Sequence, residues 1–349
     1  GKVEQLPGFG KKTVEKILKA LEDFGKRPER LPISFMLPIA DKIENQLQQV
    51  DGIEKFSKAG SIRRLNETIK DLDFIIATNK PEHIKQQLLT LDGISEVVNA
   101  GETKVTVIFD EGYDVSVDFR IVKPEEYATT LHHFTGSKDH NVRMRQLAKA
   151  RNEKISEYGV ENIETGEVLT FATEEEFFAH FGLPFIPPEV RENVGEVDAT
   201  ADDLNIITLE DIKGDLHMHS TWSDGAQSIE EMVNKAREKG YQFIAITDHS
   251  KFLRVANGLD EDRLRKQREE IDKLNEKYND IHIFAGIEMD ILPDATLDFD
   301  DEFLQEMDFV IASIHSSFNQ PKEKIMERLK VAMECPHVHL IAHPTGRLI

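Results

Sequence analysis

Three aspartates have the spacing of a divalent-cation site. Asp71 and Asp73 stand two residues apart at the start of an apolar run, Phe74 to Ala77, and alternate residues of a strand point to the same face. Carboxylates on one face repel each other unless a cation lies between them. Asp118, in the predicted strand Tyr113 to Arg120, is a third candidate. Three such oxygen donors could hold two Mg²⁺ ions, one activating a hydroxyl nucleophile and one neutralising a triphosphate.

A glycine-containing turn precedes these aspartates. Gly60 and Ser61 follow the predicted strand Ile53 to Ala59, and Arg64 comes shortly after them. The two backbone amides and the guanidinium would grip phosphate oxygens. For the aspartate pair taken alone, the alternative is a solvated turn ahead of a strand.

Seven side chains of metal-ligand type lie in the second half of the chain. Each stands at or just past the end of a predicted parallel strand, and in β/α barrels that edge is the catalytic face. Nitrogen and carboxylate donors in this number suit two or three Zn²⁺ or Mn²⁺ ions with an activated bridging water. The candidates are His217, His219, Asp224, His249, Glu288, His315 and His343. A lone histidine at a strand end is more often a polar cap, which is our interpretation of His282, His337 and His339.

The first half of the chain has the pattern of an α+β unit with an antiparallel sheet. Period-two alternation predicts strands, and apolar residues at helical spacing predict helices between them. The predicted strands are Ile53 to Ala59, Leu72 to Ala77, Ile94 to Val98, Lys104 to Phe109 and Tyr113 to Arg120. The predicted helices are Lys12 to Phe24, Ile39 to Val50, Glu82 to Leu89 and a basic segment from Asn141 to Tyr158.

A different pattern follows an acid-rich stretch. Glu189 to Asp211 contains eight acids and one base, which predicts an interdomain linker. Strands and helices then alternate, which predicts β/α units around a parallel sheet or barrel. The predicted strands are Asp215 to His219, Phe243 to Thr247, Ile281 to Ile287, Phe309 to Ser313 and Val338 to Ala342, and the predicted helices are Ile229 to Lys239, Asp262 to Tyr278 and Lys322 to Glu334.

Composition excludes several classes of protein. With 349 residues, 39% of them hydrophobic, the chain can build about two domains. It has no apolar run long enough for a bilayer, so we expect a soluble cytoplasmic protein with no membrane partner. The single cysteine, Cys335, excludes an internal disulfide and a thiol metal centre. A net charge of −22 argues against nucleic-acid binding by bulk charge, although Lys11 to Arg30 and Lys138 to Glu157 are locally basic.

The run GSIRR, followed by DLDFII, resembles the nucleotidyltransferase fold of the DNA polymerase β, or X, family. The resemblance implies that Asp71, Asp73 and Asp118 bind the catalytic Mg²⁺ or Mn²⁺ ions. It also implies that Gly60, Ser61 and Arg64 bind the nucleotide.

The segment HFTGSKDHNVRMR at residues 133–145 extends this resemblance and looks like the nucleotide-binding segment of the family. The similarity implies that Phe134 and Gly136 lie against the sugar, Asn141 at the base edge and Arg145 toward the template. His133, in the same segment, stands where the vertebrate enzymes have tyrosine. Taken alone, the segment could be a helix start capped by Ser137.

The run LPGFGKKT is similar to the second half of a helix-hairpin-helix, a motif that holds a DNA phosphate on glycine-turn amides. Gly8 and Gly10 would permit the close approach of the phosphate. Lys11 or Lys12 would add positive charge.

The histidine and acid pattern of the second half resembles the PHP (polymerase and histidinol phosphatase) domain. This resemblance implies a seven-stranded distorted barrel that hydrolyses phosphoesters at a trinuclear metal site. The matching ligands are His217, His219, Asp224, His249, Glu288, His315 and His343. The family pattern closes with an Asp-x-His after a later strand, so we expect the barrel to be incomplete within this sequence.

Together the two halves resemble a bacterial family X DNA polymerase, truncated at both ends. We expect a fingers remnant at 1–28, a nucleotidyltransferase palm at 29–124, a nucleotide-binding subdomain at 125–188, a linker at 189–212 and a partial PHP domain at 213–349. The implied function is gap-filling DNA synthesis in repair, with a PHP 3′-5′ exonuclease or 3′-end phosphodiesterase. The implied partners are gapped or primed DNA and dNTPs, and we expect a nucleoid-associated monomer.

Three alternatives remain open. The polymerase-like half could be a non-catalytic DNA-holding module beside a PHP phosphoesterase. The PHP part could instead be a scaffold beside an active nucleotidyltransferase. The chain could also transfer nucleotides to a small molecule, although the helix-hairpin-helix remnant argues against this.

Overall fold

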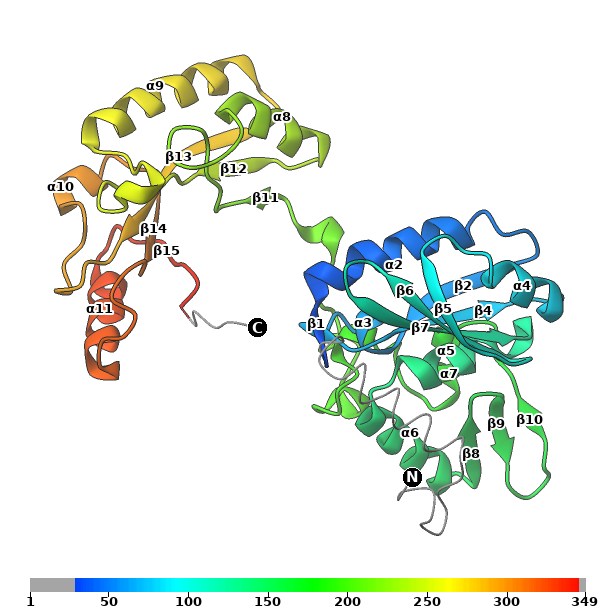
Figure 1. The fold of residues 1–349 in the computed structure, drawn as a ribbon. Helices are drawn as coiled ribbons and strands as arrows, with labels where there is room; N and C mark the ends of the chain where they lie inside the picture. Colours follow the sequence, from blue (N-terminus) through cyan, green and yellow to red (C-terminus); the bar gives the residue numbers. More distant parts are fainter. Residues whose placement is uncertain (1–28, 345–349) are drawn as a thin grey trace, which may run out of the picture. The chain divides into compact units, whose positions relative to one another are not determined.

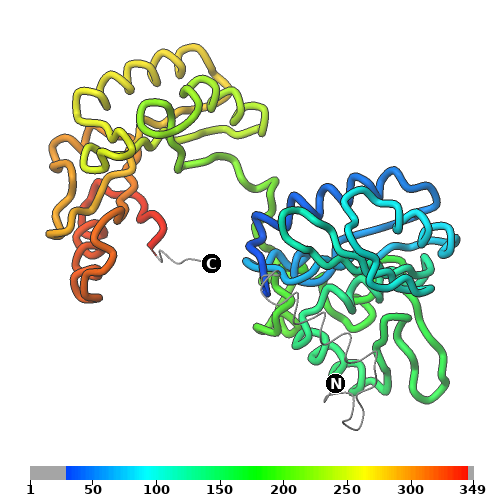
Figure 2. The backbone as a smooth tube through the Cα atoms, in the orientation of Figure 1, coloured from blue at the N-terminus to red at the C-terminus, as the bar shows by residue number. Residues whose placement is uncertain are grey.

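The structure is a computed structural model that describes residues 29–344. These residues divide into two compact units, one ending at Ile206 and one beginning at Ile207, and each is described by itself (Figure 1, Figure 2). Every helix within the described range is too short or too polar to cross a lipid bilayer. The predicted helix Lys12 to Phe24 lies outside that range.

A five-stranded mixed sheet forms the centre of the first unit, in the order β2-β4-β7-β6-β5. Its strands are β2 (Lys55–Ala59), β4 (Leu72–Ala77), β5 (Ile94–Ala100), β6 (Lys104–Asp110) and β7 (Asp114–Val122). The expected antiparallel sheet is wrong at one pair, because β4 and β7 run parallel. In the chain these two strands are separated by α4 (Pro81–Leu88), β5 and β6, which supply the long crossover that parallel pairing needs.

The two faces of this sheet are covered differently. On β7, Val117 and Phe119 are buried, whereas Asp118 between them is partly exposed on the opposite face. Side chains of α2 (Ile33–Leu47) and α4 pack on the apolar face. Helix α5 (Tyr127–Thr135) lies on the other face (Figure 1), and its Leu131 packs with Ile75 of β4. Asp118 therefore lies on the same face of the sheet as α5 and stays partly exposed.

Helix α2 begins at Ile33, ahead of the predicted start at Ile39, and contains Pro38. The predicted helix starts after Pro38 because proline usually marks the first turn of a helix. Met36, Ile39, Ala40, Ile43 and Leu47 are buried at helical spacing on both sides of the proline, so core packing holds the longer helix together. The remaining short elements of this region are β1 (Leu31–Pro32), which pairs with β3 (Thr68–Ile69), and α3 (Gly60–Arg63).

The predicted basic helix Asn141 to Tyr158 is wrong at its end. Helix α6 (Lys138–Ala150) begins behind the cap Ser137, whose Oγ accepts from His140 N at 3.2 Å, and stops at Ala150. Ile155 lies in the strand that follows the helix, and the extended backbone places its side chain in the core. The elements here are η2 (Pro124–Glu126), β8 (Glu153–Ser156), β9 (Gly159–Asn162), β10 (Val168–Leu169) and α7 (Glu174–His180).

Most of the predicted linker is part of the first unit. Arg191 is fully buried, and Val197 and Leu204 lie in the same core as Phe177 and Phe178 of α7. One acid of this stretch, Asp198, pairs with Arg143 of α6 at 2.7 Å. The stretch forms the short helices η3 (Pro188–Val190) and η4 (Glu196–Asp198). The expected linker 189–212 is thus too long at its start.

The second unit is a parallel five-stranded sheet in the order β11-β12-β13-β14-β15, which confirms the predicted β/α pattern. Its strands are β11 (Gly214–Asp215), β12 (Phe243–Ile246), β13 (His282–Asp290), β14 (Phe309–Ser313) and β15 (Leu340–Ile341). Its helices are η5 (Leu209–Asp211), α8 (Ile229–Glu238), η6 (Arg254–Ala256), α9 (Glu261–Lys277), α10 (Asp301–Leu304) and α11 (Lys322–Glu334). Apolar residues of α8 and α9 pack with those of β12 and β13 in one core.

A buried histidine pair connects helices α5 and α6 with Glu196, which lies in the stretch predicted to be a linker. His132 Nε2 of α5 lies 3.2 Å from His140 Nε2 of α6, and His140 Nδ1 lies 2.7 Å from Glu196 Oε1. Burial lowers the pKa of both imidazoles, and the charge of Arg191 lowers them further, whereas Glu196 partly opposes the shift at His140. The pair is therefore held neutral in the folded unit.

Because both histidines are held neutral, we predict that the first unit becomes less stable on mild acidification. Between pH 7.5 and 5.5 the unfolded histidines take up protons near pH 6.5 while the folded ones do not, so the free energy of unfolding decreases as pH falls. The measurement is the urea midpoint of the first unit at several pH values. His132→Phe, which suits the neighbouring Phe177 and Phe178 rings, should weaken the pH dependence, and His83→Gln at an exposed site should not. Equal slopes for all three proteins would contradict the prediction.

Candidate functional sites

Strand pairing brings the three predicted aspartates of the first unit together. Asp73 and Asp118 are direct partners in the parallel pair β4–β7. Asp71 precedes β4 and is separated from Asp73 by the buried Leu72, so both acids point away from the core. Burial, followed by the charges of Asp71 and Asp118, raises the pKa of Asp73 to about 6. The raised pKa reflects crowded negative charge, which a divalent cation would relieve.

Side chains of β6 bind the third carboxylate. Thr106 Oγ1 donates to Asp118 Oδ1 at 2.6 Å, and Lys104 Nζ lies 2.6 Å from Asp118 Oδ2. Arg120, the next residue on the same face of β7, stacks on Phe134 with its guanidinium carbon 3.6 Å from the ring centre. The candidate metal ligands of this aspartate cluster, Asp71, Asp73 and Asp118, are all carboxylates, and carboxylate oxygens suit Mg²⁺ or Mn²⁺.

Gly60 allows the turn to pass close to the aspartates. It has φ +64°, and a Cβ at this position would lie 2.7 Å from Asp73 Oδ2. Ser61 follows it in α3, and Arg64 ends that helix. Arg64 Nη1 donates to Thr135 O at 2.5 Å, and its Nε donates to Glu192 at 2.6 Å. The turn therefore links the aspartate cluster to the segment around Thr135.

Six of the predicted nucleotide-binding residues line one cavity of about 340 Å³, namely Arg64, His133, Phe134, Gly136, Asn141 and Arg145. Gly60 and Ser61 are not among its lining residues. Asn141 Nδ2 donates to His133 O at 2.7 Å, which joins α6 to the end of α5. Burial lowers the pKa of His133, which favours a neutral imidazole at the cavity wall.

Sequence reasoning missed the groups that hold this cavity in place. Arg63 donates to Thr135 Oγ1 at 2.8 Å and pairs with Glu174 at 2.5 Å. Arg191 pairs with the same carboxylate at 2.6 Å, and Arg191 O accepts from Ser137 N at 2.9 Å. Arg63 belongs to the GSIRR run, but its partners come from distant segments and no local pattern identifies them. Lys138, also in the cavity wall, directly follows the FTGS turn and could have been included.

The four predicted DNA-binding residues Gly8, Gly10, Lys11 and Lys12 lie outside the described residues. They stay predictions.

In the second unit five predicted ligands, all histidines, surround the buried carboxylate of a sixth, Glu288, and the seventh, Asp224, lies beside one of them; we call these seven residues the histidine cluster. Glu288 is 1% exposed and stands on β13. Its Oε1 lies 3.3 Å from His217 Nε2, 3.2 Å from His315 Nε2 and 3.0 Å from His343 Nε2. Its Oε2 lies 3.5 Å from His219 Nε2 and 3.0 Å from His249 Nδ1. Asp224 Oδ2 completes the group, 3.7 Å from His249 Nε2.

The donors of this histidine cluster fit metal ions. Three overlapping triads of its members have ligand atoms within 4.8 Å of one another: His217, His219 and Glu288; His219, Asp224 and His249; His249, Glu288 and His315. His219 Nδ1 and His249 Nδ1 are buried without a hydrogen bond. The second of these is close to Glu288 but not in hydrogen-bonding geometry, as expected where both atoms point to a shared ion. Imidazole and carboxylate donors suit Zn²⁺ or Mn²⁺.

Charge compensation within the cluster is strong. Burial alone would raise the pKa of Glu288, but His217, His249 and His315 hold it far below its ordinary value. Burial likewise opposes the charge of His315, yet Asp290 and Glu288 raise its pKa to about 9. The buried carboxylate thus stays ionised and needs cationic partners.

Two buried acids that support this cluster were missed. Asp290 lies 3.3 Å from His315 Nδ1, and alternation along β13 could have placed it beside Glu288. Asp248 accepts from Ser220 N at 2.8 Å and from Ser223 Oγ at 2.5 Å, so it fixes the loop that carries Asp224. Its only sequence signal is its position next to His249.

Gly60→Ala is expected to weaken Mn²⁺ binding at the aspartate cluster, because the new methyl group would displace the Asp73 carboxylate. Gly112→Ala is the matched control, since Gly112 has φ +84° with open space around its Cβ position. Both variants should lose about 1–2 kcal/mol of folding free energy from the left-handed backbone. Only Gly60→Ala should bind Mn²⁺ more weakly in a calorimetric titration, and equal affinities would contradict the assignment.

Asp290→Asn is expected to weaken metal binding by the histidine cluster by roughly 10- to 100-fold, because Asn cannot orient His315 as a carboxylate does. The measurement is metal retention against a graded chelator. Asp294→Asn, at an exposed acid of the same unit, should retain metal as the wild type does. A loss of the same size in both variants would show that the effect is not specific to Asp290.

Comparison with known proteins agrees with this division of the chain. The DNA polymerase beta thumb model matches residues 130–192, and the PHP domain model matches residues 215–343. The DNA polymerase/3′-5′ exonuclease PolX of Bacillus subtilis (strain 168) is 60% identical over 348 residues, which is 100% of this chain and 61% of that protein. The chain thus spans less than two thirds of that relative.

Two further relatives match one part of the chain each. A probable phosphatase of Acetivibrio thermocellus is 31% identical over 134 residues, covering 37% of this chain and 53% of its own length. The repair DNA polymerase X of African swine fever virus (isolate Tick/Malawi/Lil 20-1/1983) is 28% identical over 136 residues, covering 38% of this chain and 78% of its own length. The chain is therefore similar along its whole length to a PolX-type DNA polymerase/3′-5′ exonuclease, and its polymerase beta thumb match precedes its PHP domain match.

Proposed function

We propose that the chain carries out template-directed gap filling in DNA repair and trims or cleans DNA 3′ ends with its PHP domain. The observation that carries this proposal is the register of β4 and β7, which pairs Asp73 with Asp118 beside the cavity lined by Phe134 and Arg145. A carboxylate cluster next to a cavity of nucleotide-binding type suits nucleotidyl transfer. The histidine cluster of the second unit supports the second activity.

In the synthetic reaction, the primer O3′ forms a bond to the α-phosphorus, the bond to pyrophosphate breaks, and the hydroxyl proton leaves. Asp71, Asp73 and Asp118 would hold the catalytic cations. Arg64, with the Gly60 and Ser61 amides, would bind the triphosphate. Phe134 and Gly136 would lie against the sugar.

In the hydrolytic reaction, a water oxygen bonds to phosphorus, the O3′–P bond breaks, and the released 3′-hydroxyl takes the proton. His217, His219, Asp224, His249, Glu288, His315 and His343 would hold the ions. Bound divalent ions supply Lewis-acid chemistry at both sites, activating the primer hydroxyl at one and the water at the other.

The domain boundaries and partners follow from this proposal. We assign a fingers part to 1–28, the palm to 29–124 and the nucleotide-binding subdomain to 125–188 together with the packed stretch up to Ile206. The PHP domain takes the rest of the chain from residue 213. The substrates are gapped or primed DNA and dNTPs, with Mg²⁺ or Mn²⁺ at the first site and Mn²⁺ or Zn²⁺ at the second. We propose a monomer that associates with the nucleoid, with Gly8, Gly10, Lys11 and Lys12 on the DNA backbone.

A second candidate is a PHP phosphoesterase whose polymerase-like part only holds DNA. Two observations favour it. The chain is similar over 134 and 135 residues to proteins named as probable phosphatases. In addition, Lys104 Nζ lies 2.6 Å from Asp118 and would compete with a cation for that carboxylate.

An assay on one-nucleotide-gapped DNA with a 5′-labelled primer and Mn²⁺ separates the two candidates. Asp118→Ala should lower primer extension in the presence of dNTPs by about 100-fold or more, as expected for an electrostatic group at the reacting atoms. His217→Ala should lower primer shortening in the absence of dNTPs to a similar extent. Each variant should leave the other activity intact.

Matched controls are Glu102→Ala, an exposed acid beside the same sheet, and His282→Ala, an exposed histidine of β13. Both should behave as the wild type does. Extension that is absent from the wild type, with shortening still sensitive to His217→Ala, would favour the phosphoesterase candidate. If neither primer extension nor primer shortening changes on substitution, the assignments of Asp118 and His217 are both refuted.

A further inference from the structure

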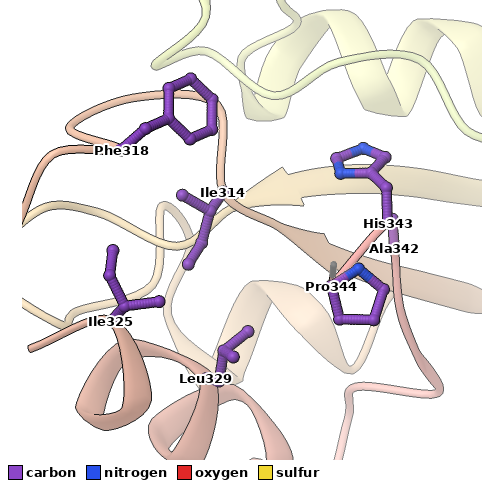
Figure 3. Close-up of a pocket in the computed structure, with 7 residues that line it drawn as sticks. All are labelled: Ile314, Phe318, Ile325, Leu329, Ala342, His343 and Pro344. Atoms are coloured by element: carbon purple, nitrogen blue, oxygen red, sulfur yellow. The ribbon is translucent and has the colours of Figure 1, made fainter. Parts of the chain in front are cut away.

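An apolar pocket lies directly beside the histidine cluster. It has a volume of about 230 Å³ and is bounded by the loop after β14, by α11 and by the end of β15 (Figure 3). Its lining includes Ile314, Phe318, Ile325, Leu329, His343 and Pro344. Drug-sized ligands occupy pockets of roughly 300–1,000 Å³, so this one suits a smaller group, such as a single planar ring system.

Phe318 forms one wall of the pocket and is 67% exposed. Its loop is anchored on both sides of it, because the buried Arg328 donates to Ser316 O at 2.9 Å and to Gln320 Oε1 at 3.0 Å. Arg328 also donates to Ile291 O, which ties the loop to the end of β13. A single exposed apolar side chain is ordinary on a protein surface. An exposed aromatic ring on an anchored loop is a preformed stacking surface.

His343 joins this pocket to the histidine cluster. Its ring lines the pocket, and its Nε2 lies 3.0 Å from Glu288 Oε1. His315, another member of the cluster, stands on the same loop as Phe318. In Figure 3 the rings of Phe318 and His343 lie on one side of the pocket, and Ile325 and Leu329 of α11 lie on the other. A ligand held by the cluster can therefore extend into the pocket.

A nucleotide has the chemistry that both parts require. Its phosphodiester is an anion that suits cations held by the cluster, and its base, one sugar away, is a flat ring system with apolar faces. Among the seven lining residues, His343 is the one with a polar side chain. Recognition in the pocket would therefore depend on stacking against the face of the base, which every base offers.

We propose that Phe318 and this pocket receive the base of the 3′-terminal nucleotide while its phosphodiester lies at the histidine cluster. The inference rests on the proposed hydrolytic function of the PHP domain and adds a substrate-positioning residue to it. It predicts an end-trimming site that requires a terminal base without preferring one. The competing occupant of the pocket is a segment of this protein's own chain.

Equilibrium binding tests the proposal without turnover. The wild-type full chain, titrated in a calorimeter with Mn²⁺ present, should bind thymidine 5′-monophosphate about tenfold more tightly than deoxyribose 5-phosphate, which lacks the base. Phe318→Ala should abolish this difference and leave the sugar phosphate affinity unchanged. Phe318→Trp should restore the difference. Met333→Ala, which removes a 73% exposed side chain of α11 outside the pocket, should have no effect.

Hydrolysis provides a second readout. Phe318→Ala should raise KM for thymidine 5′-p-nitrophenyl phosphate about tenfold at constant kcat. The KM for methyl p-nitrophenyl phosphate, which has the same leaving group and no base, should not change. If the wild type hydrolyses neither ester, the proposed PHP activity fails, and the binding titration still decides the role of Phe318.

Two results would overturn the inference. One is equal affinity of wild type and Phe318→Ala for thymidine 5′-monophosphate. The other is a lower unfolding midpoint of Phe318→Ala with no change in any nucleotide parameter, which would indicate that the protein's own chain covers the pocket.

Discussion

Parallel strand pairing is the constraint on which both candidate sites depend. In the first unit the β4–β7 pair sets Asp73 opposite Asp118, although the two residues belong to separate motifs. In the second unit the parallel register of β12, β13 and β14 brings His249, Glu288 and His315 to one edge. Parallel neighbours end on the same side of a sheet, so residues distant in sequence come together at one candidate site.

This placement concentrates charge, and the surrounding structure compensates for it. Asp73 is mostly buried between two other carboxylates, which raises its pKa to about 6. Glu288 is buried too, but five histidines contact it and it stays ionised. The first cluster therefore offers carboxylate oxygens alone, whereas the second is rich in imidazole nitrogen. That difference in donors favours hard cations such as Mg²⁺ at one and Zn²⁺ or Mn²⁺ at the other.

Much of the fold was predictable because periodicity is local. The strands Leu72–Ala77 and Phe309–Ser313 and the helix Lys322–Glu334 have the predicted bounds, since each has a clear apolar period and definite end signals. Errors occurred where tertiary contacts overrode local signals. Core packing carries α2 through Pro38, and Ile155 reaches the core as part of a strand instead of a helix.

Sequence by itself determined which side chains are candidate ligands and which segments carry them, because residue type and spacing along one strand are local properties. Only the tertiary structure decided which segments meet. The acid-rich stretch around Arg191 and Glu196 is charged enough to suggest a solvated linker, yet both residues are buried against partners from other elements. The same holds for the pocket beside Phe318, whose walls come from a loop, a helix and a strand end. Burial and charge pairing depend on contacts between distant residues, and no local pattern encodes those partners.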